Sequence, residues 1–303
     1  MSRALNIWKF TDGKSGHESQ STGLVSELGK IFEVDEKTID VNSLPNAFCM
    51  FFYWLFKSRP QNYPKNNPDL IIGAGHKTHS PMLFAKSISG GKTIVLMKPS
   101  LPIKRFDIVI APKHDEITKR PNVIETSGVL NAIECVDDKN SKRGLMLIGG
   151  NSRHYDWNDT QIVSQIKKIL EEDSDVDWTL TTSRRTPDSF LNLLEDFNIK
   201  VVPFANTNKE WMDEHYKNSG TIWVSPDSVS MVYESLTSGA ATYVFSLHET
   251  SNESRVRNGL LDLVAQNAVM TFDKWEENPS KKHSPQQFNE ASRVAKLILE
   301  LIS

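Results

Sequence analysis

The stretch from residue 11 to residue 20, TDGKSGHESQ, gathers the side chains best suited to acid–base chemistry near the start of the chain. A histidine side chain titrates near neutral pH, so His17 is a candidate general base, and Asp12 could orient its ring. Two glycines allow close approach of a ligand to the backbone. The alternative is a helix-entry loop whose charges are simply solvated. The remaining candidate binding residues of this loop are Gly13, Lys14, Gly16 and Gln20.

Two adjacent arginines, Arg184 and Arg185, follow a strand-like run and precede Pro187, which suits the first turn of a helix. A positive charge at the N-terminus of a helix interacts unfavourably with the helix dipole and destabilises the helix by roughly 0.3 kcal/mol or more. A charge-assisted hydrogen bond to phosphate stabilises by roughly 1.5–3 kcal/mol, which is more than the destabilisation by the dipole. The pair, with Ser183 beside it, therefore predicts a diphosphate site, and a solvated arginine pair is the alternative.

A third candidate loop, Gly149-Gly150-Asn151, follows the strand-like run 144–148. Backbone N–H groups in such a turn could bind a diphosphate, and a tight turn without a ligand is the alternative.

A helix is expected to begin at Asp227 or Ser228, because both residue types cap helices. The candidate nucleotide- or phosphate-binding residues of this segment are Asp227, Ser228, Ser230 and Glu234. Ser230 and Glu234 lie four residues apart and therefore share one face of this helix. The carboxylate of Glu234 could accept hydrogen bonds from both hydroxyls of a ribose. A capped helix with an exposed glutamate is the alternative.

Two weaker patterns involve glycines in the first half of the chain. The loop after the buried run 69–73 matches only the start of G-x-G-x-x-G, so a ligand loop and a simple turn are equally good interpretations. Residues 90–93, GGKT, look like the end of a P-loop, but a helix precedes them, so we interpret the glycines as a helix C-cap. The candidate residues of the first loop are Gly75, His76 and Lys77.

Short apolar runs alternate with helix-length segments, which predicts an α/β fold with parallel sheets covered by helices. The pattern restarts after the polar stretch 135–143, and 303 residues suit two domains. We therefore predict two Rossmann-like domains, 1–138 and 139–303. No metal or other cofactor is expected, because the D-x-D at 175–177 precedes a strand instead of following one.

The formal charge of −3 argues against a generally basic surface for nucleic acid. Two distant cysteines make no disulfide framework, which favours a reducing, cytoplasmic setting. The longest apolar run, 48–56, is too short to span a bilayer. With Lys57 and Arg59 behind it, the segment 48–59 could lie on a membrane surface; a buried helix is the commoner explanation.

Three motifs resemble, in this order, the mitochondrial-fission elongated-mitochondria protein family and its bacterial homologues. They read DGK-x-GH-x-x-Q at 12–20, TSRRTP at 182–187 and DSVSM-x-x-E-x-x-x-x-G at 227–239. The resemblance implies a GT-B fold, in which two domains face a cleft and the last helix, about 286–302, returns to the first domain. It also implies a nucleotide-sugar enzyme, although the plant relative is known for promoting mitochondrial division.

The motif at 227–239 is more distantly similar to the donor site of the peptidoglycan lipid-linked N-acetylglucosaminyltransferase. Glu234 matches the ribose-binding glutamate of that family by spacing, and His17 matches a histidine of its acceptor-side loop. The chain departs from the family at 247–250, which read LHET where paired glutamines contact the donor sugar. The identity of the sugar therefore stays open.

These resemblances imply metal-independent transfer of a sugar from a nucleotide-diphosphate-sugar to an acceptor, which could be lipid-linked or part of the cell envelope. In that interpretation His17 and Asp12 act on the acceptor hydroxyl, and the second domain holds the donor. A nucleotide-sugar 2-epimerase of the same fold is one alternative. A non-catalytic recruiting scaffold is the other.

Overall fold

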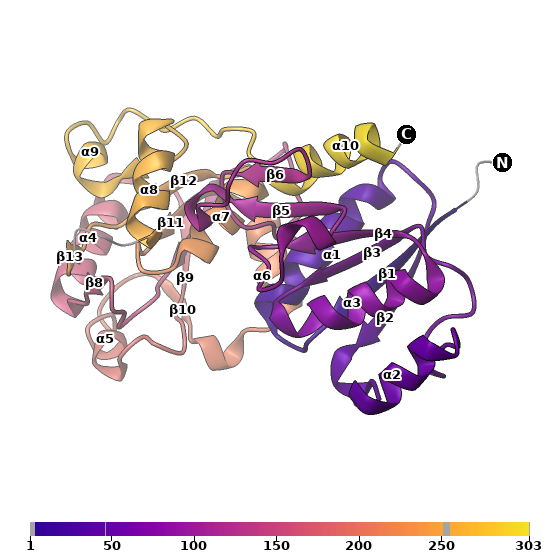
Figure 1. Cartoon of the computed structure of the whole chain (residues 1–303). Helices are drawn as coiled ribbons and strands as arrows, with labels where there is room; N and C mark the ends of the chain where they lie inside the picture. The colour runs from indigo at the N-terminus through magenta and orange to yellow at the C-terminus, as the bar shows by residue number, and fades with distance from the viewer. Residues whose placement is uncertain (1–3, 46, 251–254, 303) are drawn as a thin grey trace. The chain divides into compact units, whose positions relative to one another are not determined.

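The structure is a computed structural model that describes residues 4–45, 47–250 and 255–302. The chain divides into two compact units: unit 1 comprises residues up to 132 and from 290 onward, and unit 2 comprises residues 133–289. Each unit contains one parallel sheet of six strands (Figure 1). The predicted α/β class with two Rossmann-like halves is therefore confirmed.

Unit 1 has a doubly wound sheet. In pairing order its strands are β2 (Val34–Asp40), β1 (Leu5–Thr11), β3 (Leu70–Ala74), β4 (Lys92–Leu96), β5 (Ile108–Pro112) and β6 (Val123–Thr126). Its α-helices are α1 (Ser15–Gly29), α2 (Ala47–Leu55), α3 (His76–Ser89) and α10 (Glu290–Ile302). Strands β3 and β5 are buried along their whole length, as expected for a parallel sheet covered on both faces.

The last helix, α10, packs against α1 in unit 1 and so confirms the expected return of the chain. Leu24 and Leu28 of α1 share one buried cluster with Val294 and Ile298 of α10. The Glu290 carboxylate at the start of α10 also accepts the Ser127 backbone N–H at 2.8 Å, just beyond β6. A second buried cluster, which includes Trp8 and Met82, lies between the sheet and α3.

Helix α1 approaches the segment around Asn131 so closely that only glycine fits at position 23. A Cβ on Gly23 would lie 1.9 Å from the Asn131 carbonyl oxygen. We expect Gly23→Ala to lower the free energy of unfolding by about 1–3 kcal/mol, because backbone must move to relieve the clash. Gly29→Ala on the same helix is the matched control, since its Cβ would meet nothing within 4 Å. Equal melting temperatures of the two variants would contradict this packing.

Unit 2 repeats the architecture with a second sheet. In pairing order its strands are β10 (Lys200–Val202), β9 (Asp177–Thr181), β7 (Asn140–Leu147), β11 (Ser219–Val224), β12 (Ala241–Val244) and β14 (Met270–Thr271). A separate antiparallel pair joins β8 (Tyr155–Asp156) and β13 (His248–Glu249). The α-helices are α4 (Asp159–Glu172), α5 (Asp188–Asn192), α6 (Lys209–Asn218), α7 (Val229–Ser238), α8 (Arg255–Ala265) and α9 (Phe272–Glu276).

The core of unit 2 follows from helix periodicity and aromatic packing. Ile162, Ile166 and Ile169 of α4 are fully buried at the spacing of one helix face. Trp223 of β11 contacts a set of aromatic rings on the same cluster. The rings in contact with Trp223 are those of Tyr243, Phe245, Phe272 and Trp275.

The segment that follows Ala132 belongs to unit 2, a few residues before the boundary predicted from composition. The Val136 backbone N–H donates to the Ser238 carbonyl at 3.2 Å, and the Lys139 ammonium donates to the Tyr216 carbonyl at 2.5 Å. Through these bonds, the polar stretch that the sequence suggests as a linker is attached to unit 2.

Each sheet has one point at which the strand order reverses direction. In unit 1 the point lies between β1 and β3, and in unit 2 it lies between β7 and β11. Ligands of parallel α/β sheets bind at the carboxyl ends of the strands beside such points. The loops after these four strands are therefore the places where a site is expected.

None of the described helices is long and apolar enough to span a membrane.

Candidate functional site

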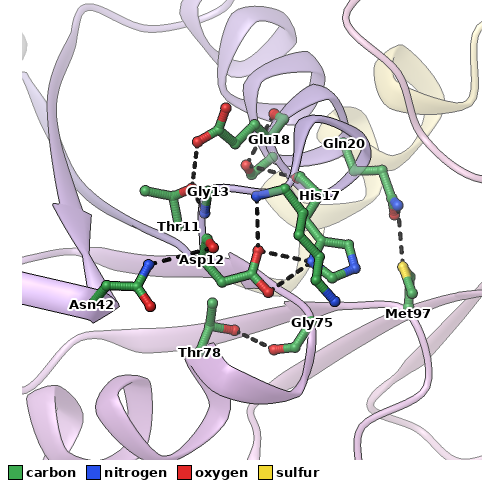
Figure 2. A network of polar contacts seen from close by, with 12 residues as sticks. Thr11, Asp12, Gly13, His17, Glu18, Gln20, Asn42, Gly75, Thr78 and Met97 are labelled. Carbon is green, nitrogen blue, oxygen red and sulfur yellow. Dashed lines mark hydrogen bonds and ion pairs between the residues drawn. The ribbon is translucent and has the colours of Figure 1, made fainter.

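The loop after β1 brings Asp12 and His17 together in unit 1. The His17 Nδ1 atom lies 3.0 and 3.1 Å from the two carboxylate oxygens of Asp12, and the Lys14 backbone N–H lies 3.3 Å from one of them (Figure 2). The Asp12 side chain is completely buried, whereas the His17 side chain is 17% exposed. The predicted pairing is therefore present, with the histidine at the more accessible end.

Glycine is required at the start of the neighbouring loop after β3. Gly75 has φ +86°, and a Cβ there would lie 2.4 Å from two atoms of the His17 ring. The loop after β3 thus contacts the loop after β1 beside the reversal point of the sheet (Figure 2). This close contact explains why position 75 is a glycine, and its predicted role in an acceptor-side loop stays a prediction.

The electrostatics of the pair fix the orientation of the histidine ring. Burial raises the pKa of Asp12, but the hydrogen bonds from His17 and the Lys14 backbone N–H outweigh it, and the pKa is lowered overall. An ionised carboxylate only accepts hydrogen bonds, so the His17 Nδ1 atom carries the hydrogen. The Nε2 atom is then the proton acceptor of the ring, as in a histidine oriented for general-base catalysis.

The other loop residues of unit 1 surround this pair with varied contacts. The Gln20 side-chain amide donates to the Met97 sulfur at 3.1 Å, and Met97 has a left-handed backbone with φ +70°. Gly13, Lys14, Gly16, His76 and Lys77 are at the surface or partly exposed. Their predicted role in holding a second substrate stays a prediction.

One further histidine near the pair was not among the candidate site residues. Burial, followed by the charges of His76 and His17, lowers the pKa of His79 to about 4. Its Nδ1 atom lies 3.0 Å from the Ser100 hydroxyl. The three-residue spacing of His76 and His79 on α3 was a visible signal. Among the described residues, no group of three His, Cys, Asp or Glu side chains could hold a metal ion.

In unit 2, the backbone N–H groups of the Gly149–Asn151 turn are already used within the protein. Gly149 donates to the Ser225 hydroxyl at 2.7 Å, and Gly150 donates to the Asp227 carboxylate at 3.0 Å. Asn151 donates to the Arg185 carbonyl at 3.2 Å. The loop after β11 therefore supplies the acceptors of Gly149 and Gly150, and the segment after β9 supplies that of Asn151. The predicted role of these N–H groups in binding a diphosphate stays a prediction.

The arginine pair is also different from the expectation of two unpartnered charges. Arg185 makes an ion pair of 2.8 Å with the buried carboxylate of Asp227. The Arg184 guanidinium lies over the Phe204 ring, 5.0 Å from its centre. A carboxylate, not a phosphate, therefore neutralises Arg185 here. Arg184 remains exposed at the surface.

The predicted ribose ligand, Glu234, faces the neighbouring helix in this structure. Its carboxylate accepts the Tyr216 hydroxyl at 3.0 Å, and burial raises its pKa to about 7. Ser228 and Ser230 lie at the start of α7, where Ser228 makes no side-chain cap hydrogen bond. The Ser183 hydroxyl donates to the Gly149 carbonyl at 2.7 Å. The predicted contacts of these side chains with a nucleotide stay predictions.

Two Rossmann-like units, each built on a six-stranded parallel sheet with one reversal point, are typical of the GT-B class of fold. Solved structures agree with this class. A Listeria monocytogenes protein described as a UDP-N-acetylglucosamine 2-epimerase matches with a TM-score of 0.60 at 9% identity, over 99% of this chain and 96% of that chain. A heptosyltransferase from E. coli, solved with ADP, matches with a TM-score of 0.52 at 10% identity, over 98% and 100%.

The chain belongs to the mitochondrial fission ELM1 family, whose model matches residues 15–302. A bacterial relative, the uncharacterized protein RP120 of Rickettsia prowazekii, is 24% identical over 97% of this chain and 98% of its own length. The family predicted from the three motifs is therefore confirmed.

Proposed function

We propose that this protein transfers a sugar from a nucleotide-diphosphate-sugar to an acceptor hydroxyl without a metal ion. The observation that carries the proposal is the Asp12–His17 pair at the reversal point of unit 1. An ionised, buried carboxylate holds a partly exposed histidine, which is the arrangement that a general base needs. The similarity in fold to a nucleotide-sugar epimerase and a heptosyltransferase supports the class of substrate.

In the proposed reaction, Nε2 of His17 takes the proton of the acceptor hydroxyl as its oxygen bonds to the anomeric carbon of the sugar. The bond from that carbon to the diphosphate breaks, and the nucleoside diphosphate leaves with the electron pair. Asp12 keeps the ring oriented and stabilises the positive charge that develops on it. The leaving group needs positive charge, which Arg184 and the N-terminus of α7 would supply.

Direct measurement of transfer tests this proposal. Mass spectrometry would follow sugar transfer from UDP-, GDP-, CDP- and ADP-sugars to a panel of lipid-linked and soluble acceptors. A thermal-shift screen with the same nucleotides comes first, because a ligand at a hundred times its Kd adds about 2.7 kcal/mol of stability. Turnover of the donor without any acceptor would instead identify an epimerase. Absence of binding to every nucleotide would leave only the scaffold interpretation.

A second feature supports an acceptor at a membrane surface. Phe52 and Leu55 on α2 are 41% and 53% exposed, and Phe56, just after the helix, is 71% exposed. Residues 41–68 contain three basic and no acidic side chains. Exposed aromatic side chains beside uncompensated positive charge suit the surface of an anionic bilayer. We therefore propose that α2 contacts the membrane from which a lipid-linked acceptor would be taken.

Vesicle sedimentation tests the membrane contact. The wild type is expected to sediment with phosphatidylcholine vesicles that contain phosphatidylglycerol. Phe52→Ser with Phe56→Ser should weaken this binding by about tenfold or more, equivalent to roughly 1.4 kcal/mol. Leu261→Ser on α8 removes a similarly exposed side chain of unit 2, 45% exposed, and should have no effect. Equal binding by all three proteins would argue against α2 as the contact.

A further inference from the structure

Several buried side-chain polar atoms of unit 2 lack hydrogen-bond partners within the described residues, and two of them lie in segments that follow neighbouring strands at the carboxyl end of the sheet. These two atoms are Oδ1 of Asp227 and the hydroxyl oxygen of Tyr155. Asp227 follows β11, and Tyr155 lies in β8, beyond the turn that follows β7. Because native proteins pair nearly all their buried polar groups, two such atoms beside a reversal point indicate a missing partner.

The Asp227 carboxylate is held firmly through its other oxygen. Oδ2 accepts the Gly150 backbone N–H at 3.0 Å and pairs with Arg185 at 2.8 Å. The carboxylate also fills the space beside Gly149, where a Cβ would lie 2.1 Å from Oδ2 and 2.3 Å from Oδ1. The free oxygen, Oδ1, is therefore fixed in place and can only accept a hydrogen bond.

Tyr155 supplies the complementary group, because its hydroxyl remains protonated. Burial raises its pKa to about 12, with further contributions from the charges of Glu249 and Asp227. Tyr155 lies opposite Glu249 in the β8–β13 pair, and Glu249 makes an ion pair with Arg257. The Tyr155 hydroxyl therefore stays a donor near the Asp227 carboxylate.

The chemistry of these two atoms selects one kind of ligand group. A phosphate oxygen cannot donate a hydrogen bond to Oδ1, and its charge is repelled by the carboxylate. A hydroxyl both donates and accepts, so it can satisfy Asp227 and Tyr155 at once. The Arg185 side chain is 41% exposed, so a ligand can reach Asp227 by displacing the guanidinium.

We propose that Asp227 and Tyr155 bind a hydroxyl of the transferred sugar and thereby select the sugar of the donor. The inference rests on the proposed function, since it assigns one part of the nucleotide-sugar to this place. It also moves the diphosphate away from the Gly149–Gly150 turn, toward Arg184 and α7. Asp227 is thus a specificity residue and not a phosphate ligand.

Calorimetry with matched ligand pairs tests this assignment. The pairs are UDP and UDP-N-acetylglucosamine, GDP and GDP-mannose, and ADP and ADP-glucose. For the pair that the wild type binds, Asp227→Asn and Tyr155→Phe should each weaken binding of the nucleotide-sugar by about tenfold or more. Neither should weaken binding of the bare nucleotide. Tyr63→Phe in unit 1 is the matched control and should change neither affinity.

Three other results of the calorimetry would each contradict the assignment, and each has a different pattern of affinities. Equal loss for a nucleotide and its sugar would place the hydroxyl on the ribose and overturn the sugar contact. Tighter binding of both ligands to Asp227→Asn, without loss of sugar preference, would show that Asp227 only competes with the diphosphate. Failure of the wild type to bind any pair would overturn the proposed function itself, and the sugar contact with it.

The ligand-free protein provides an independent test of the premise. If the Tyr155 hydroxyl has no partner, Tyr155→Phe removes a buried polar group and keeps the shape of the side chain. Its melting temperature should equal or exceed that of the wild type. A clearly lower melting temperature would show that the hydroxyl is already bonded, and the proposed ligand contact would then lose its basis.

Discussion

Replacement of His17 by glutamine is expected to lower the turnover rate of sugar transfer by about 100- to 10,000-fold, the usual contribution of a general base. Glutamine fills much of the same space but cannot accept the proton of the acceptor hydroxyl. Binding of the nucleotide-sugar should stay unchanged, because the donor is proposed to bind in unit 2. The measurement is kcat by mass spectrometry together with the donor Kd by calorimetry.

Two further variants separate a catalytic effect of His17 from a structural one. Asp12→Asn keeps a hydrogen-bonding side chain but removes the ionised carboxylate that fixes the ring, so kcat should fall at least about tenfold. His215→Gln on α6 is the matched control; its Nδ1 atom lies 2.8 Å from the Trp211 carbonyl, and no change in rate is expected. Wild-type kcat in the His17 variant would exclude it as the base.

Replacement of Glu234 by glutamine is expected to stabilise the protein above neutral pH. The pKa of Glu234 is raised from 4.5 to about 7 by burial, so the folded state keeps a proton that the unfolded chain has released. The unfolding free energy from this group therefore falls as pH rises from about 4.5 to 7. By pH 8, Glu234→Gln should be more stable than the wild type by about 3 kcal/mol.

The test compares the variants with the wild type at each pH, because the protonation of His79 changes the stability with pH in the opposite direction. The pKa of His79 is lowered from 6.5 to about 4 by burial and by the nearby histidines. Stability from His79 is therefore lost as pH falls through that range. Urea unfolding of the wild type, Glu234→Gln and the exposed control Glu210→Gln between pH 5 and 8 isolates the Glu234 contribution. A constant difference across this range would contradict the raised pKa of Glu234.

Local signals predicted most of the secondary structure. Runs such as Leu70–Ala74 are short, apolar and bounded by turn residues, as is typical of central parallel strands. Gly90 does end α3, with φ +74° and its N–H bonded to the Lys86 carbonyl, so the P-loop-like sequence is a helix C-cap. The edge strand β6 and the two-residue strands were not predicted, because such short segments are not long enough to display a periodic pattern of apolar residues.

Helix α5 shows where local reasoning fails. The sequence predicts a helix over 187–197, whereas the structure has one only at Asp188–Asn192. The residues that follow form turns. Phe190 of α5 and Leu194 of these turns both pack into the core of unit 2. Tertiary packing therefore overrides the helical pattern at this point.

The sequence alone determined the α/β class, the family and the Asp12–His17 pair, because each depends on residues close together along the chain. Only the tertiary structure decided which charges are already satisfied. The residues around Arg185 in the sequence offer it no ion-pair partner, but Asp227, from the loop after β11, pairs with it in space. Helical spacing placed Glu234 on one face with Ser230, as a ribose ligand or an exposed glutamate, but only the structure shows that it accepts the Tyr216 hydroxyl of α6. Ion pairing and burial depend on distance in space, and sequence spacing fixes that distance only within one turn or helix.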